Sequence, residues 1–305
     1  MDEEYHRPLI LMGSDKGLLC LLDYKDNIVY LWNPAIKEEF KALLSSPKAP
    51  REWKCTHSAY GFGYDPLTFD FKVVKVSALD ENGYGNLNSY KSCNKVGVYS
   101  LRSNSWKRLT MPNIFSELES DTGSSSSDMT TFTTLLRCSL VVNGSVHWMI
   151  CFGRSRHYDD SSFGIVAFDL STEVFKLIKC PQSVRGPQVK KLGELSECLS
   201  FLTCVENGLV EVWVMKNYGD SDSWFKYLSV NLFKLCPVRA GLGDHCGYSY
   251  FPVGILRNGN VVLDCPETGY LCWYEPKNNI INNLCPRFFV SEFTTYVQSS
   301  FKLTG

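Results

Sequence analysis

The stretch that decides the fold is Val96-Gly-Val-Tyr99-Ser-Leu-Arg-Ser-Asn-Ser-Trp106-Lys-Arg-Leu109. Two short apolar runs flank a polar segment, and an aromatic residue closes the first run seven positions before an aromatic residue in the second. A polar start with Asp, Asn, Ser or Pro nucleates a turn. Two large residues with this spacing can then face each other as a cross-strand pair. The stretch therefore predicts a β-hairpin with one buried face.

The same unit recurs along the chain. With an interval of seven it runs from Tyr64 to Phe71, from Phe168 to Phe175 and from Tyr274 to Ile281, and with an interval of eight from Trp32 to Phe40. One hairpin alone is marginal in water, so the copies must bury one another's faces. Blades of about 40 to 50 residues arranged radially achieve this. We predict an all-β propeller of about six blades of short antiparallel strands. A two-sheet sandwich is the alternative.

Three Asn-Gly pairs predict further hairpins, at 143–144, 207–208 and 258–259. Each pair separates two strand-like runs, and Asn-Gly tolerates the positive φ angles of a type I′ turn better than other pairs. No stretch has the pattern of a long amphipathic helix. The segment from Phe288 to Phe301 fits a helical face about as well as a strand.

The composition describes a globular chain with balanced charge. Of its 305 residues, 44% are hydrophobic and 13% aromatic, enough for a full core. The formal net charge is −1, with 31 basic and 32 acidic residues interspersed. This pattern argues against nucleic acid as a partner, and it contains no polybasic membrane patch. No apolar run reaches the roughly 20 residues of a membrane-spanning helix.

The 13 cysteines are scattered and contain no Cys-x-x-Cys pair. Cys20 and Cys151 adjoin apolar runs, where a thiol behaves as a small core hydrophobe. Neither a disulfide framework nor a zinc site is predicted. The first eight residues lack the pattern of a signal peptide. We therefore expect the reducing interior of the cell, in the cytoplasm or the nucleus.

Eight pieces of sequence follow one another in a recognisable order. They are Gly13-Ser-Asp-Lys-Gly-Leu-Leu-Cys20, Leu31-Trp-Asn-Pro34, Tyr60-Gly-Phe-Gly-Tyr-Asp-Pro66, Val98-Tyr-Ser-Leu101, Val142-Asn-Gly-Ser-Val-His-Trp148, Phe168-Asp-Leu170, Val212-Trp-Val-Met-Lys216 and Tyr296-Val297. This order is similar to the F-box-associated interaction domain of plant F-box proteins, a kelch-like group that includes the S-locus F-box proteins. The resemblance covers nearly the whole chain.

The resemblance implies a role in protein ubiquitination. In that family an N-terminal F-box binds a Skp-type adaptor and thereby a cullin ubiquitin ligase, and the propeller captures the target protein. We expect residues 13–305 to form the propeller domain. Residues 1–12 are too few for an F-box. The expected function is therefore target recognition, and the adaptor and cullin are expected partners only if an F-box is supplied elsewhere.

No catalytic, cofactor or metal site is predicted, and we expect the chain not to be an enzyme. The five histidines form no His-x-x-x-His pair, and His147 fits a hydrogen-bonded position in a strand. His245 and Cys246 are adjacent, so in a strand they would point to opposite faces. Gly61 and Gly63 do not extend to a Gly-x-Gly-x-x-Gly motif, and close backbone packing explains them better.

A glycan-binding or glycan-processing propeller is the alternative function. Some propellers are glycosidases that use paired carboxylates, and Glu211 and Asp264 are candidates in principle. The separation between two carboxyl groups decides that chemistry. A solvated strand face explains Glu211 without catalysis.

Long polar loops interrupt the repeats at 80–94, 115–131, 153–162, 181–195 and 217–223. Binding residues concentrate on loops that a rigid scaffold presents, and Tyr and Arg are over-represented among interface anchors. The predicted protein-binding residues are Tyr84, Tyr90, Arg154, Arg156, His157 and Tyr218.

Overall fold

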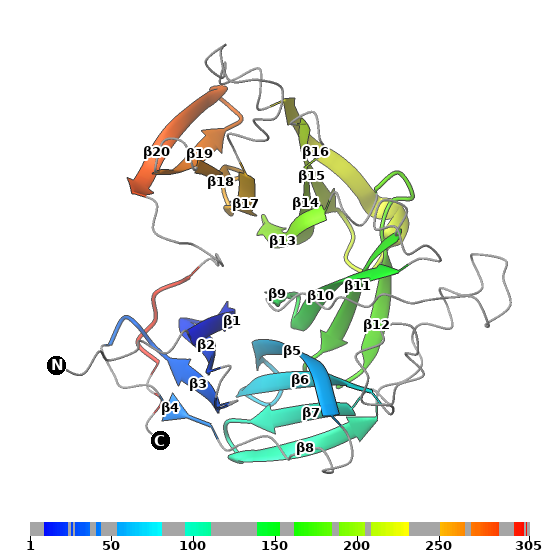
Figure 1. Cartoon of the computed structure of the whole chain (residues 1–305), viewed down its shortest axis with the longest axis vertical. Coiled ribbons are helices and arrows are strands. Elements are labelled where there is room, and N and C mark those ends of the chain that lie inside the picture. Colours follow the sequence, from blue (N-terminus) through cyan, green and yellow to red (C-terminus); the bar gives the residue numbers. More distant parts are fainter. Residues whose placement is uncertain are drawn as a thin grey trace, which may run out of the picture. The chain divides into compact units, whose positions relative to one another are not determined.

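The computed structural model describes residues 9–23, 26, 28–36, 41–43, 54–80, 95–110, 139–152, 162–184, 189–204, 209–231, 251–265, 270–286, 296–301 and 303 (Figure 1). They belong to two compact units, which are described separately. Unit 1 comprises Met1–Trp148, Val166–Leu177 and Thr294–Gly305, and unit 2 comprises Met149–Ile165 and Ile178–Phe293.

The strands form five four-stranded sheets, and in each sheet the strands follow the order of the chain. The first sheet contains β1 (Leu9–Asp15), β2 (Leu18–Asp23), β3 (Ile28–Trp32) and β4 (Lys41–Ala42), and the second β5 (Lys54–Asp65), β6 (Asp70–Asp80), β7 (Lys95–Ser100) and β8 (Ser105–Thr110). The third contains β9 (Leu140–Val142), β10 (Ser145–Phe152), β11 (Ser162–Asp169) and β12 (Phe175–Lys179).

The fourth sheet contains β13 (Val189–Leu195), β14 (Cys198–Cys204), β15 (Leu209–Met215) and β16 (Trp224–Asn231), and the fifth β17 (Phe251–Ile255), β18 (Val261–Cys265), β19 (Tyr270–Glu275) and β20 (Ile280–Pro286). Successive strands pair antiparallel, as in β5–β6 and β14–β15. Within the described ranges, the only helical element is a single 3₁₀ turn at Ser221–Ser223. In this part of the chain we find no helix with the length and apolar character needed to cross a membrane.

Within each unit, the first strands of successive sheets lie next to one another. In unit 1, β5 contacts β1 and β9, and in unit 2, β13 contacts β17. Four-stranded meanders that meet through their first strands are the blades of a β-propeller. The predicted all-β propeller class is therefore confirmed. About six blades were expected, and the described residues form five. Their first strands start at residues 9, 54, 140, 189 and 251. Some of these intervals are longer than the 40 to 50 residues assumed for each blade, so fewer blades fit into the chain.

The aromatic residues that flank the turns pair across their strands, as predicted. The ring centroids of Tyr99 and Trp106 are 5.4 Å apart, those of Tyr64 and Phe71 5.0 Å, and those of Phe168 and Phe175 4.7 Å. Tyr274 lies opposite Ile281 in the register of β19 and β20. The fifth predicted pair ends at Phe40, which is outside the described residues.

The Asn-Gly turns follow the prediction at one site and differ at another. Asn143 and Gly144 have φ values of 50° and 69° and join β9 to β10 as a two-residue type I′ turn. At 258–259 the predicted hairpin is confirmed, because β17 pairs antiparallel with β18, but the turn is not type I′, because Gly259 has a positive φ and Asn258 does not. There Asn258 Oδ1 accepts a hydrogen bond from the Asn260 N–H at 3.0 Å and favours a longer turn. The pair at 207–208 is outside the described residues.

Each unit has its own apolar core. In unit 1 it includes Met12, Leu31 and Phe62, and in unit 2 Val212 and Leu263. The cysteine prediction is confirmed for Cys20, and Cys272 is likewise a buried free thiol, whereas the side chain of Cys151 is outside the described part of the chain. Burial raises the pKa of the Cys20 thiol well above its usual range, so it stays neutral.

Two further sequence expectations concern residues of unit 1. His147 is fully buried, and its Nδ1 lies 3.2 Å from the Leu140 carbonyl oxygen, which confirms a hydrogen-bonded strand position. Gly61 allows close packing, because a Cβ there would lie 2.3 Å from Val146 Cγ1. Of the segment 288–301, only 296–301 is described, and it has no regular secondary structure.

Candidate protein-binding site

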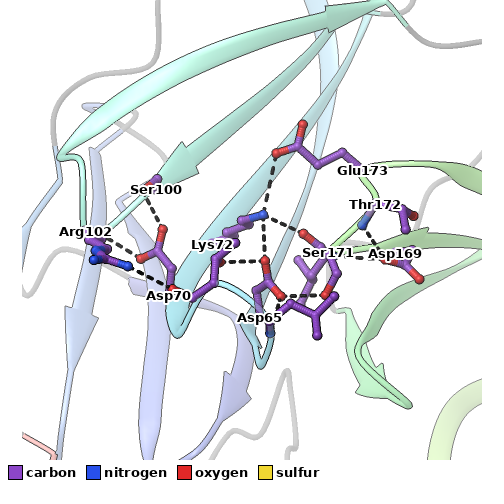
Figure 2. Close-up of polar contacts among 12 residues, drawn as sticks. Asp65, Asp70, Lys72, Ser100, Arg102, Asp169, Ser171, Thr172 and Glu173 are labelled. Carbon is purple, nitrogen blue, oxygen red and sulfur yellow. Dashed lines mark hydrogen bonds and ion pairs between the residues drawn. The ribbon is translucent and has the colours of Figure 1, made fainter.

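Two tight turns of the second sheet lie at the same end of that sheet. In a meander, the β5–β6 turn (66–69) and the β7–β8 turn (101–104) must share one end. Arg102 joins them, because its Nη1 donates to the Thr68 carbonyl oxygen at 3.2 Å. Its backbone N–H donates to Asp70 Oδ1 at 2.9 Å, and Ser100 Oγ donates to Asp70 Oδ2 (Figure 2).

A buried ion pair connects this end to the third sheet (Figure 2). Lys72 Nζ lies 2.9 Å from Asp65 Oδ2 and also donates to the Leu170 carbonyl oxygen at 2.6 Å. Ser171 Oγ donates to Asp65 Oδ1 at 2.5 Å. Leu170 and Ser171 belong to the β11–β12 turn, so turns that are far apart in the sequence are held together in unit 1.

The environment of Asp65 stabilises its charged form. Burial by itself raises the pKa of this carboxyl, but hydrogen bonds from Ser171, Thr68, Lys72 and the Leu67 N–H outweigh it. The net effect holds the pKa well below its usual range. The carboxylate is therefore ionised at neutral pH and remains paired with Lys72.

Glu173 extends the ion pair toward solvent (Figure 2). One of its carboxylate oxygens lies 3.5 Å from Lys72 Nζ, and the other lies 2.6 Å from Lys107 Nζ on the edge strand β8. The Lys107 side chain is 63% exposed. Glu173 has a φ of 58°, and its backbone N–H donates to the Asp169 carbonyl oxygen at 2.8 Å. These contacts fix the β11–β12 turn.

Large apolar side chains project from these fixed turns. Leu67 is 74% exposed and Phe69 75% exposed on the β5–β6 turn, and Val174 is 48% exposed on the β11–β12 turn. Phe69 also has a φ of 54°, which is rare for a bulky residue and costs about 1–2 kcal/mol. We call Leu67, Phe69, Arg102, Lys107 and Val174 the turn surface.

The comparisons with known proteins agree with the sheet architecture. The family model described as "F-box associated beta propeller domain" matches residues 10–299. The chain belongs to this family.

Plant F-box proteins are among its relatives. An F-box/kelch-repeat protein of Arabidopsis thaliana is 30% identical over 222 residues, which covers 72% of this chain and 52% of that protein. The F-box protein CPR1 of the same plant is 29% identical over 307 residues, covering 93% of this chain and 66% of that protein. The chain thus spans about half to two thirds of the length of these relatives.

Solved structures match this F-box-associated domain only distantly. The major Malassezia sympodialis allergen Mala s 1 aligns with 92% of this chain and 78% of its own, with 8% identity and a TM-score of 0.46. A likeness of this size supports no argument about function.

Of the six binding residues predicted from the sequence, the structure describes one. Tyr218 is 38% exposed in the connection between β15 and β16. The other five, Tyr84, Tyr90, Arg154, Arg156 and His157, are outside the described residues, and binding by all six stays a prediction. The turn surface was not predicted from the sequence, although the sequence contains a signal for it. Two bulky apolar residues, Leu67 and Phe69, stand in a turn where polar residues are usual.

The carboxylates considered for glycan chemistry are on different strands of unit 2. Glu211 on β15 is 2.5 Å from Lys226 Nζ and accepts a hydrogen bond from Trp213 Nε1 at 3.2 Å. Asp264 lies on β18 and is 9% exposed. In the described part of the chain, no cluster of three or more His, Cys, Asp or Glu residues could hold a metal ion. His245 and Cys246 are outside that part.

Proposed function

We propose that this F-box-associated domain is the target-recognition part of an SCF-type ubiquitin ligase receptor and acts by binding, without catalysis. The family match over residues 10–299 carries the proposal. Relatives named as F-box proteins support it. The partner is a target protein. A Skp-type adaptor and a cullin join the assembly where an F-box accompanies the domain.

The site of action in this proposal is the cytoplasm or the nucleus. Ubiquitination by cullin ligases requires an intracellular location, and buried free thiols such as Cys20 and Cys272 are compatible with a reducing compartment. Glu211, considered for glycan chemistry, is paired with Lys226 at 2.5 Å, which explains its position without catalysis.

Affinity purification of the full chain from plant cells tests the proposal. Epitope-tagged protein is recovered after treatment with an inhibitor of cullin activation, so that targets accumulate. We expect at least one protein to be enriched and to bind the purified chain directly, and a fusion to an F-box to increase its ubiquitination. Glycan-array binding without any direct protein partner would overturn the proposal.

The six predicted loop residues are tested in the same purification. Alanine variants of Tyr84, Tyr90, Arg154, Arg156, His157 and Tyr218 are compared with Lys277→Ala, an exposed residue in the β19–β20 turn. Recovery of the target should fall for variants at the interface and stay unchanged for Lys277→Ala. Unchanged recovery for all six variants would show that these loops do not bind the target.

A further inference from the structure

We propose that the turn surface binds an acidic, extended segment of the target protein that inserts a large apolar side chain beside Phe69. The proposal rests on the proposed function, because it assumes that the partner is a protein. It adds where the partner binds and what chemistry it carries. Exposed apolar area, a preorganised backbone and the sign of the exposed charges all favour such a partner.

The β5–β6 turn exposes more apolar surface than its own folding needs. Leu67 and Phe69 are each about three quarters exposed, so neither contributes much to the core of unit 1. Burying such a side chain against a partner favours binding, because it removes apolar surface from water. A polar residue at either position would serve the turn equally well. The pair is therefore suited to a partner that covers it.

The backbone that carries these side chains is already fixed. Asp65 Oδ1 accepts from the Leu67 N–H at 3.0 Å, and Thr68 Oγ1 donates to Asp65 Oδ2 at 2.6 Å. Asp70 closes the other end of the turn through Ser100 and Arg102. A preorganised surface loses little conformational entropy on binding, so more of the contact energy appears as affinity.

The exposed charges on the three hairpins that carry the turn surface are positive. Among the described side chains of the β5–β6, β7–β8 and β11–β12 hairpins in unit 1, the exposed charged residues are Arg102, Lys107, Arg108 and Lys176. None of the described carboxylates there is exposed: Asp65 and Asp70 are buried, Glu173 is paired with Lys72 and Lys107, and half-buried Asp169 accepts hydrogen bonds from the Ser171 and Thr172 N–H groups. An acidic segment complements this pattern, and electrostatic complementarity favours specificity and fast association.

Peptide binding by the full chain tests the proposal directly. The probes are three fluorescent dodecapeptide libraries: one rich in Asp and Glu with a fixed central Leu or Phe, one with Asn and Gln in place of the acids, and one with Ser at the central position. Fluorescence anisotropy should show the first library binding about tenfold more tightly than either of the others. Equal binding of all three would overturn the proposal.

Phe69→Asn separates binding from folding. Asn tolerates a positive φ better than Phe, so the melting temperature should stay equal or rise. Affinity for the acidic apolar library should nevertheless fall about tenfold. Ile280→Ser is the control, because Ile280 is a large apolar residue that is 44% exposed at the start of β20 in the fifth sheet. Affinity that survives Phe69→Asn, or falls equally with Ile280→Ser, would contradict the proposal.

Arg102→Glu tests the sign of the charge. This variant should lose affinity for the acidic library and gain affinity for a library with Lys in place of the acids. Two further probes are tested in parallel: vesicles that contain phosphatidylserine, and single-stranded DNA. If the chain binds the vesicles or the DNA but none of the peptides, and Phe69→Asn abolishes that binding, the turn surface does not bind a protein segment.

The two proposals can fail independently. If the wild-type chain recovers a target and the Phe69→Asn and Arg102→Glu variants recover it equally well, the turn surface is wrong and the proposed function stands. If the wild-type chain recovers no target, the proposed function fails, and the peptide assay still reports on the turn surface.

Discussion

Lys72 Nζ lies 2.9 Å from Asp65 Oδ2 in unit 1, and the two side chains are 8% and 0% exposed. Removing two charges from water is costly, and their attraction offsets that cost only when the remaining polar atoms are also satisfied. Here Ser171 and Thr68 donate to Asp65, and Lys72 also donates to the Leu170 carbonyl oxygen. The pair therefore acts as one unit that joins the β5–β6 and β11–β12 turns.

The first prediction is a strong coupling between these two residues. Lys72→Met leaves a buried carboxylate without its cation and should lower the free energy of unfolding by about 3–5 kcal/mol. Asp65→Asn should cost a similar amount, and the double variant should cost clearly less than the sum. Urea denaturation measures each value. Lys226→Met is the control, because its pair with Glu211 is partly exposed and should contribute at most about 1 kcal/mol. Strictly additive losses for Lys72 and Asp65 would contradict the coupling.

The second prediction concerns stability in mild acid. Burial lowers the pKa of His147 from 6.5 to about 4, although hydrogen bonds to the backbone of Leu140 and Ser145 act in the opposite direction. As the pH falls from 6.5 to 4, the unfolded chain takes up this proton before the folded chain does. Stability should therefore fall by about 3 kcal/mol over this range. His147→Gln should flatten the profile, and an unchanged slope between pH 7 and 4 would refute the assignment.

The third prediction concerns a more acidic range. Asp65 has a lowered pKa in the folded state, so its contribution is present above its ordinary value of 3.8 and is lost as the pH falls below it. Unfolding free energies measured at pH 5, 4 and 3 should therefore keep falling between pH 4 and 3, after the slope caused by His147 has ended near pH 4. Asp65→Asn should remove that drop while leaving the His147 slope between pH 6.5 and 4 intact. A drop that persists in Asp65→Asn would assign it to another carboxyl group.

Local signals explain what the sequence predicts well. The polar residue that starts each turn and the aromatic residue seven positions later both act within one hairpin, so the pairs Tyr64–Phe71 and Tyr99–Trp106 could be predicted. The contact of Lys72 with Leu170 could not be predicted, because it joins residues far apart in the chain and depends on how the sheets pack. The exposure of Phe69 could not be predicted either, because turn residues are expected to be polar and a large apolar residue is expected to be buried.

Turns without glycine were also missed. Ser196 and Glu197 have φ values of 50° and 63° and form the two-residue connection between β13 and β14. Type I′ geometry is normally marked by Asn-Gly, so Ser-Glu gives no signal in the sequence. Packing of Leu195 and Leu202 in the core of unit 2 fixes the strands and imposes the turn between them.

The fourth prediction follows from this strained turn. Replacing Ser196 with Asn and Glu197 with Gly should raise the free energy of unfolding by about 1 kcal/mol, because both positions then tolerate a positive φ. The reverse change, Asn143→Ser with Gly144→Glu, should lower it by a similar amount. No atom lies within 4 Å of a Cβ at Gly144, so steric clash would not explain the loss. Thermal and urea denaturation measure both effects, and a neutral result in both variants would show that packing alone sets these turns.

The last prediction concerns residues 296–301 and Leu303, which Asn33 helps to hold against the first sheet of unit 1. Asn33 is fully buried, and its Nδ2 donates to the carbonyl oxygens of Ser299 at 3.1 Å and Phe301 at 2.8 Å. Tyr296 donates its hydroxyl to Asn33 Oδ1 at 3.1 Å, and Leu303 inserts into the core. A single amide therefore satisfies several groups of a segment that belongs to no sheet.

Asn33→Ala should release this segment, because it leaves backbone carbonyls and a tyrosine hydroxyl without their partner. We expect a loss of about 2 kcal/mol in unfolding free energy. Amide exchange in 296–301 should accelerate more than exchange in β13–β16, and chymotrypsin should cleave faster at Phe301. Asn278→Ala is the control, because its amide donates to Glu275 in an exposed turn. If exchange in 296–301 accelerates no more than exchange in unit 2, Asn33 contributes to general stability and does not specifically hold the C-terminal segment.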